Sequence, residues 1–100
     1  MFFLASNLVF DPTTTEHLDR KSINSLCKKL QNRFPVIAKT KSVPEADGVA
    51  SIVVVAIGRR QDTLSQLVDD LEKFCEDSGF GRIESEQTML ESFDALDELE

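Results

Sequence analysis

The stretch of sequence that decides the fold is Val49-Ala-Ser-Ile-Val-Val-Val-Ala-Ile57. Its apolar residues occupy both sets of alternating positions, which is typical of a strand that is covered on both faces. Such a strand belongs in the middle of a sheet. Gly58 ends the run, and Asp47-Gly48 just before it is the signal of a tight turn. We therefore expect the sheet to be built around residues 49–57.

Three further strands are predicted on either side of this segment in the sequence. Residues 2–10 are rich in Phe, Leu and Val and end at Asp11-Pro12. Residues 36–43 alternate between two faces and carry two lysines, which suits an exposed edge of the sheet. Residues 82–89 form a weaker and more polar strand, which also suits an edge.

Two segments have the period of an amphipathic helix. Residues 16–34 place one apolar side chain every three or four positions, and Pro35 ends the segment. Residues 62–78 show the same period and stop at Gly79-Phe-Gly81. After residue 90 a shorter repeat stands among acids and predicts a short amphipathic helix or tail; its members are Leu90, Phe93, Leu96 and Leu99.

The predicted order of elements is β-α-β-β-α-β with the tail added. Two β-α-β units in this order make a ferredoxin-like sandwich, in which right-handed crossovers put the first and third strands in the middle. We therefore predict an α+β fold over residues 1–89, with a four-stranded antiparallel sheet and two helices on one face. An acidic amphipathic tail over residues 90–100 follows this domain.

The composition is that of a globular protein of one domain. The chain has 100 residues, of which 41% are hydrophobic and 29% charged, and this excludes intrinsic disorder. The net charge of -7 is uneven, because residues 51–100 hold four Lys and Arg against thirteen Asp and Glu. An acidic chain repels nucleic acids and anionic membranes at long range. Without a membrane-length apolar run or a recognisable signal peptide, we expect a cytoplasmic protein with no membrane partner.

The residues that most often carry chemistry are few. Cys27 and Cys75 fall on the apolar stripes of the two predicted helices, so we expect buried, reduced thiols; one disulfide between them is the alternative. His17 is the single histidine and lacks partners at metal-ligand spacing. We therefore predict no catalytic residues, no metal and no cofactor.

The basic residues form the most informative surface feature. From Arg20 to Lys41 there are seven Lys and Arg and no acid, and Arg59-Arg60 follows the third strand. One interpretation is a surface that binds RNA or another polyanion. The other is compensation, in which ion pairs cross from the basic first helix to the acidic second helix. The candidate anion-binding residues are Lys21, Lys28, Lys29, Arg33, Lys39, Lys41, Arg59 and Arg60.

The second face of the sheet is a candidate association surface. Both central strands are apolar on both faces, whereas the helices cover only one face, and monomers rarely leave such a patch in water. The tail, a second copy of the chain or an apolar ligand would cover it. The candidate residues are Val53, Val54, Leu90, Phe93 and Leu96.

Two segments resemble the YlxP-like family of small bacterial domains. They are Ser25-Leu-Cys-Lys-Lys-Leu-Gln-Asn-Arg-Phe34 and the Val-rich run from Ile52 to Phe74, and the resemblance spans roughly residues 15–88. The chain departs from the family pattern at Thr15-Glu-His-Leu-Asp-Arg-Lys21 and in having no Trp. The resemblance implies a ferredoxin-like cytoplasmic protein of unknown function, often encoded beside translation and ribosome-maturation genes. It supplies no functional residues.

Together these features predict a non-enzymatic module that self-associates as a homodimer and assists RNA- or ribosome-linked processes. The alternative is a regulatory domain that binds a small molecule on the open face of its sheet. An enzyme without a recognisable signature is the third interpretation, since the sequence contains no visible set of acid, base, nucleophile or metal ligands.

Overall fold

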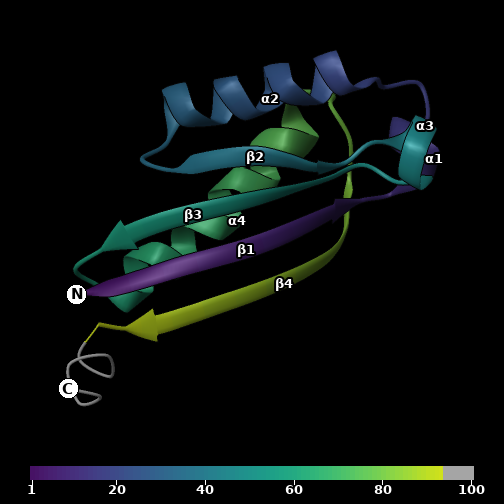
Figure 1. Ribbon diagram of the computed structural model, residues 1–100. Coiled ribbons are helices and arrows are strands. Elements are labelled where there is room, and N and C mark those ends of the chain that lie inside the picture. The colour runs from purple at the N-terminus through teal and green to yellow at the C-terminus, as the bar shows by residue number, and fades with distance from the viewer. Residues whose placement is uncertain (94–100) are drawn as a thin grey trace.

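The computed structural model describes residues 1–93 (Figure 1). Within them the chain forms one four-stranded sheet, two long helices and two helices of a single turn. The strands are β1 (Phe2–Phe10), β2 (Ile37–Ser42), β3 (Ser51–Gly58) and β4 (Ile83–Ser92). The helices are α1 (Pro12–Thr15), α2 (Arg20–Arg33), α3 (Pro44–Asp47) and α4 (Gln61–Asp77).

The sheet is antiparallel throughout and has the order β2-β3-β1-β4. The predicted α+β class is confirmed, and so is the central place of the third strand. β3 pairs with β1 on one side, where Leu8 lies opposite Ile52, and with β2 on the other, where Ala38 lies opposite Val54. The helices account for half of the apolar pattern of residues 49–57, because they bury Ile52, Val54 and Ala56. The other half, with Val55 and Ile57, stays exposed on the second face of β3.

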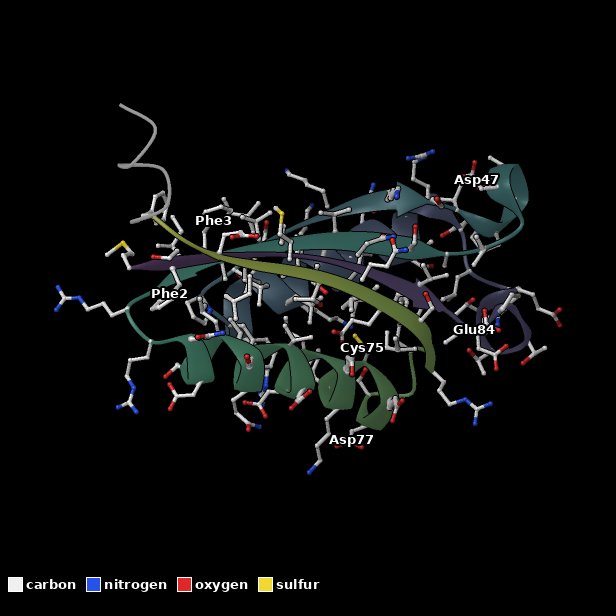
Figure 2. All side chains as sticks on the ribbon, turned by 90° about the horizontal axis from the view of Figure 1, so that it is seen from below. Phe2, Phe3, Asp47, Cys75, Asp77 and Glu84 are labelled. Atoms are coloured by element: carbon white, nitrogen blue, oxygen red, sulfur yellow. The ribbon has the colours of Figure 1, made fainter. Side chains whose placement is uncertain are left out.

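Both long helices lie on the same face of the sheet (Figures 1 and 2). The main core shows this directly, since it joins Ile23 and Leu30 of α2, Leu71 of α4, and Leu8 and Ile52 of the sheet, all fully buried. A smaller cluster at one end of the sheet packs α4 against β1 and β3; it contains Leu4, Ala56, Leu64 and Val68. The helix layer therefore leaves the other face of the sheet without a covering element of residues 1–93.

The first long helix begins later than the sequence predicted. Residues 12–15 form the separate turn α1, whose N-terminus is capped by Asp11 through the Thr13 N–H at 3.0 Å. Asp19 then caps α2 by accepting 2.8 Å hydrogen bonds from the N–H and hydroxyl of Ser22. The predicted single helix from residue 16 is wrong at its start, because two aspartates cap two successive helices. None of the helices within residues 1–93 is long and apolar enough to cross a membrane.

The last strand is longer than predicted. β4 continues to Ser92, which pairs with Phe2, and Leu90 pairs with Leu4. Residues 90–92 therefore belong to the sheet, and the predicted strand over residues 82–89 ends three residues too early. The remainder of the predicted tail, with Leu96 and Leu99, lies outside the described residues.

Candidate interaction surface on the open sheet face

Alternation along each strand divides the sheet into two faces with different surroundings. Leu4, Leu8, Ile52 and Val54 point towards the helices and are completely buried. Figure 2 shows Phe3 on the side of the sheet away from α4, whereas Cys75 lies between the sheet and α4. We call the side away from the helices the open face; it is formed by Ile37 and Lys39 of β2, Val53, Val55 and Ile57 of β3, Phe3, Ala5, Asn7 and Val9 of β1, and Gln87, Met89 and Glu91 of β4.

The strand register places apolar side chains of all four strands next to one another. Residues that pair across strands stand on the same face of a sheet at neighbouring positions. One row contains Ile37, Val55, Ala5 and Met89, and the next contains Ile57 and Phe3, followed by Glu91. Ile37 and Ile57 are each 60% exposed and Met89 is 50% exposed. We call these two rows, without Glu91, the apolar end of the open face.

Phe93 extends the apolar end. Its ring centroid lies 5.0 Å from that of Phe3, and its N–H donates a 3.0 Å hydrogen bond to the carbonyl of Met1. The sequence predicts that either Val53 or Val54 faces outward, and it wrongly places Leu90 on the same face. Val54 is buried against the helices while Val53 faces outward, and Leu90 packs with the smaller core cluster on the helix side. The reason is the period of two, which sends neighbouring residues of a strand to opposite faces.

The adjacent row of the open face is polar. It contains Lys39, Val53, Asn7 and Gln87 in this order from β2 to β4. Asn7 is notable because its Oδ1 is buried and has no hydrogen-bond partner within residues 1–93. A shallow hollow of about 310 Å³ lies around it, between Ala5, Val53, Gln87 and Met89. A buried acceptor without a donor is uncommon in folded proteins.

The candidate anion-binding residues are all exposed, but they lie on different parts of the molecule. Lys21, Lys28, Lys29 and Arg33 belong to α2 and therefore to the helix layer. Lys39 stands on the open face, on the opposite side of the sheet, and Arg59 and Arg60 lie in the connection from β3 to α4. The fold therefore does not gather the eight residues into one patch.

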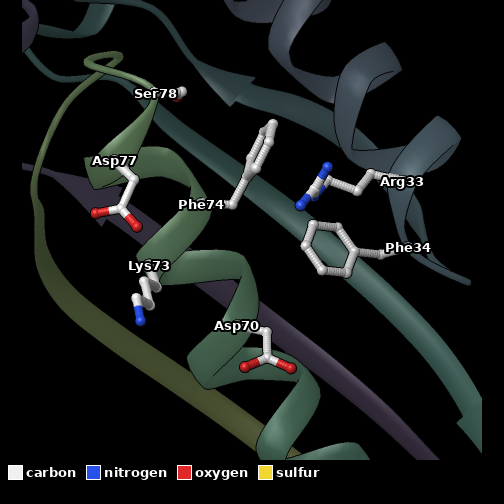
Figure 3. Close-up of a pocket in the computed structure, with 7 residues that line it drawn as sticks. All are labelled: Arg33, Phe34, Asp70, Lys73, Phe74, Asp77 and Ser78. Atoms are coloured by element: carbon white, nitrogen blue, oxygen red, sulfur yellow. The ribbon is translucent and has the colours of Figure 1, made fainter.

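The ion pairs predicted between the two long helices are not found among residues 1–93. The ion pairs there are Arg60–Asp62 at 3.0 Å and Asp11–Arg82 at 3.2 Å, and neither connects α2 to α4. Arg33 of α2 instead contacts aromatic rings. The guanidinium of Arg33 lies 5.2 Å from the Phe74 ring centroid and 6.0 Å from that of Phe34, and the two rings meet edge to face at 5.8 Å (Figure 3).

These residues form one wall of an open groove between the helix ends, with a volume of about 530 Å³. Asp70, Lys73 and Asp77 of α4 line its other side, so charges of both signs face it (Figure 3). A groove of mixed charge with Arg33 already stacked on Phe74 does not favour one class of ligand.

The two cysteines are free and buried, as predicted. Burial raises the pKa of the Cys75 thiol to about 12, and it raises the pKa of the Cys27 thiol as well. The Cys27 sulfur lies 3.8 Å from the hydroxyl of Thr40. Both groups therefore stay protonated at neutral pH and pack as small apolar side chains.

A pair of carboxyl groups joins α4 to β4, and sequence reasoning missed it. Burial of Glu72, together with its hydrogen bond to Glu86, raises the pKa of Glu72 to about 7. The same hydrogen bond and one from Thr88, at 2.7 Å, lower the pKa of Glu86. Glu72 and Glu86 lie 14 positions apart on different elements, so no local sequence motif predicts their contact. The pair holds one proton below about pH 7 and releases it as the pH rises through that value.

Comparison with protein-family models and with curated proteins returns no match for this chain. The resemblance to YlxP-like domains therefore stays a prediction from the sequence.

Proposed function

We propose that this chain is a ferredoxin-like domain that acts as a non-enzymatic association module and self-associates through its open sheet face. The order β2-β3-β1-β4 supports the fold proposal, because β1 and β3 are central and each is followed by a long helix on the same face. The two single-turn helices add to this plan without changing the strand order.

The apolar end of the open face is the observation that carries the functional proposal. Isolated apolar side chains are common on protein surfaces, but a contiguous patch across four strands marks an interaction site. Here Ile37, Val55, Ile57 and Met89 are between 41% and 60% exposed and are brought together by the register of the sheet. Their burial removes apolar surface from water, at about 25 cal/mol per Å².

The size of the open face suits a second copy of the chain. Four strands about 4.8 Å apart, each about eight residues long at about 3.3 Å per residue, have a footprint of roughly 500 Å². The accessible area of such a face is larger than its footprint, because side chains project from it. Stable protein pairs bury about 800 Å² on each partner. The face of one sheet is therefore of the right order for a homodimer.

A small-molecule site is the second candidate, and the hollow around Asn7 favours it. It is lined by the apolar side chains of Ala5, Val53 and Met89 and by the polar side chains of Asn7 and Gln87. A ligand with an apolar body and one polar group would fit that chemistry. The hollow is at the small end of the range for ligand pockets, so we rank this candidate below self-association.

The positions of the basic residues support an RNA-linked function less well than the apolar end of the open face supports self-association. Of the eight basic candidates, only Lys39 and Lys41 belong to the sheet, while the α2 residues face away from it. A polyanion that contacts one side of the molecule would reach only part of the set. We therefore place RNA contacts outside the proposed function.

Sedimentation equilibrium over low to high micromolar concentrations tests the proposal. We expect the wild-type protein to be dimeric and the Val55→Glu variant to be monomeric, because the new carboxylate would be buried in the interface. Ser65→Glu is the matched control, since it adds the same charge on the exposed side of α4 and should leave the dimer intact. A wild-type protein that stays monomeric at every concentration contradicts the proposal.

A further inference from the structure

The two edge strands of the sheet carry opposite charges. β2 contains Lys39 and Lys41 and no acid, whereas β4 contains Glu84, Glu86 and Glu91 and no Lys or Arg. All five charged side chains are exposed. Because β2 and β4 are the two outer strands, the lysines and the acids stand at opposite edges of the sheet, with the neutral strands β3 and β1 between them. Glu86 pairs with Leu8 and contacts Glu72 of α4, so it faces the helices, whereas Glu91 pairs with Phe3 on the open face.

The open face is also uneven along the strands. The rows of Ala5 and Phe3 form the apolar end, and the row of Asn7 next to them carries Lys39 and Gln87. The charge of the sheet therefore changes from one edge strand to the other, and the polarity of the open face changes along the strands. Two copies that pack face to face must match each other in both charge and polarity.

When the strands of the two copies are aligned, two arrangements bring the same face of both copies together about a two-fold axis. When the axis runs parallel to the strands, β2 of each copy lies over β4 of the other, and apolar end meets apolar end. When the axis crosses the strands at the middle of the face, between the rows of Ala5 and Asn7, β2 lies over β2. That second arrangement also sets each apolar end against the polar row of the other copy.

Polarity and charge both select the first arrangement. It keeps the lysines of the two copies at opposite edges, with Lys39 over the partner's Gln87, whereas the second brings Lys39 and Lys41 near the same lysines of the other copy. It also buries apolar side chains against apolar side chains. We propose that two copies pack open face to open face about a two-fold axis parallel to the strands, with β2 of each over β4 of the other. This rests on the proposed function and adds the identity and orientation of the partner.

Site-directed cross-linking tests the orientation. Lys39 and Gln87 occupy the same row at opposite edges of the sheet, so the proposed dimer sets Lys39 over the partner's Gln87. We would make Lys39→Cys and Gln87→Cys as separate proteins, mix them, and add a short bismaleimide. Packed sheets lie about 10 Å apart, beyond the span of a disulfide, so a cross-linker is needed. The native Cys27 and Cys75 are buried and give little background.

We expect the mixed product, which joins position 39 of one copy to position 87 of the other, to dominate at least tenfold over both homogeneous products in mass spectrometry. Ser65→Cys, on the exposed side of α4, is the control and should give no cross-link with either variant. Dominant 39–39 or 87–87 products would overturn the orientation while leaving the proposed self-association in place. Sedimentation of the same variants as monomers would overturn both.

Discussion

At the scale of single residues, Glu72 makes the stability of the protein depend on pH near neutrality. Its pKa is raised from 4.5 to about 7, chiefly because α4 and β4 bury it and because it donates to Glu86. Since the folded-state pKa lies above the unfolded one, the stabilisation is fully present below about pH 4.5 and is lost as the pH rises through about 7. Because the pKa of Glu86 is lowered, Glu86 affects the stability only at acid pH. Within the pair, Glu72 therefore determines how the stability changes between about pH 5 and pH 8.

We predict that Glu72→Gln flattens the fall of the melting temperature between about pH 5 and pH 8, because the amide keeps a donor without titrating. Thermal unfolding followed by circular dichroism measures this. Glu45→Gln on α3 removes an exposed carboxylate elsewhere and should keep the wild-type slope. Equal slopes in wild type and Glu72→Gln would show that the carboxyl pair does not control the transition.

Position 81 requires glycine because its neighbours lie too close for a Cβ, and not because of its backbone conformation. A Cβ at this position would lie 2.5 Å from the Cγ2 of the buried Thr15 and 3.2 Å from the ring of Phe10. We predict that Gly81→Ala lowers the free energy of unfolding by about 1–3 kcal/mol, and that adding Thr15→Ser, which removes that methyl group, recovers part of the loss. Urea denaturation of the two variants checks this.

The comparison for Gly81 is Gly79, which has a φ of +76° and open space around the position of a Cβ. Gly79→Ala should therefore destabilise only through backbone strain, and Thr15→Ser should bring it no recovery. Recovery in both backgrounds would show that Thr15→Ser acts generally and not through the contact with Gly81.

At the scale of elements, the sequence predicts the strands and helices that have a regular apolar pattern. It does not predict features that depend on packing against another element. The apolar pattern of residues 49–57 identifies β3 and its central place because every position supports it. The apolar residues around Leu90 fit the spacing of a helix and the alternation of a strand equally well. Pairing with β1 makes this segment a strand. Val53 and Val54 are equivalent in the sequence, and only the helices on one face distinguish them. The Glu72–Glu86 contact depends on the packing of α4 and has no local signal.

The basic edge strand carries a prediction at the same scale. If β2 lies over β4 of a second copy, which has no Lys or Arg and carries Glu91 on the open face, reversing Lys39 and Lys41 to Glu should weaken the dimer about tenfold at low salt. Added salt should reduce the difference between this variant and the wild type. Sedimentation equilibrium at two ionic strengths measures both effects. Lys28→Glu with Lys29→Glu on α2 makes the same charge change in the helix layer and should leave the dissociation constant unchanged. An equal loss of dimer affinity in the two double variants would show that the net charge of the protein, and not the position of the lysines, causes the effect.

At the scale of the whole molecule, the two thiols report on the opening of the core. Cys27 and Cys75 belong to one cluster that joins both long helices to the sheet. We predict that an aromatic disulfide reagent reacts with both thiols slowly and at one common rate under native conditions, because each thiol is exposed only when the core opens. A dimer adds a second effect, since labelling should slow as protein concentration rises. Fast reaction of one thiol alone would show a separate local opening.

The central position of β1 also has a consequence for synthesis. This strand, rich in Phe, Leu and Val, is translated before all its partners, yet its hydrogen-bonding edges are filled only by β3 and β4, which begin at Ser51 and Ile83. At about 5–20 residues per second, a ribosome leaves β1 without its second neighbour for several seconds. During that interval Phe2–Phe10 is an apolar strand with two free edges, which is the substrate that chaperones recognise and that aggregation consumes.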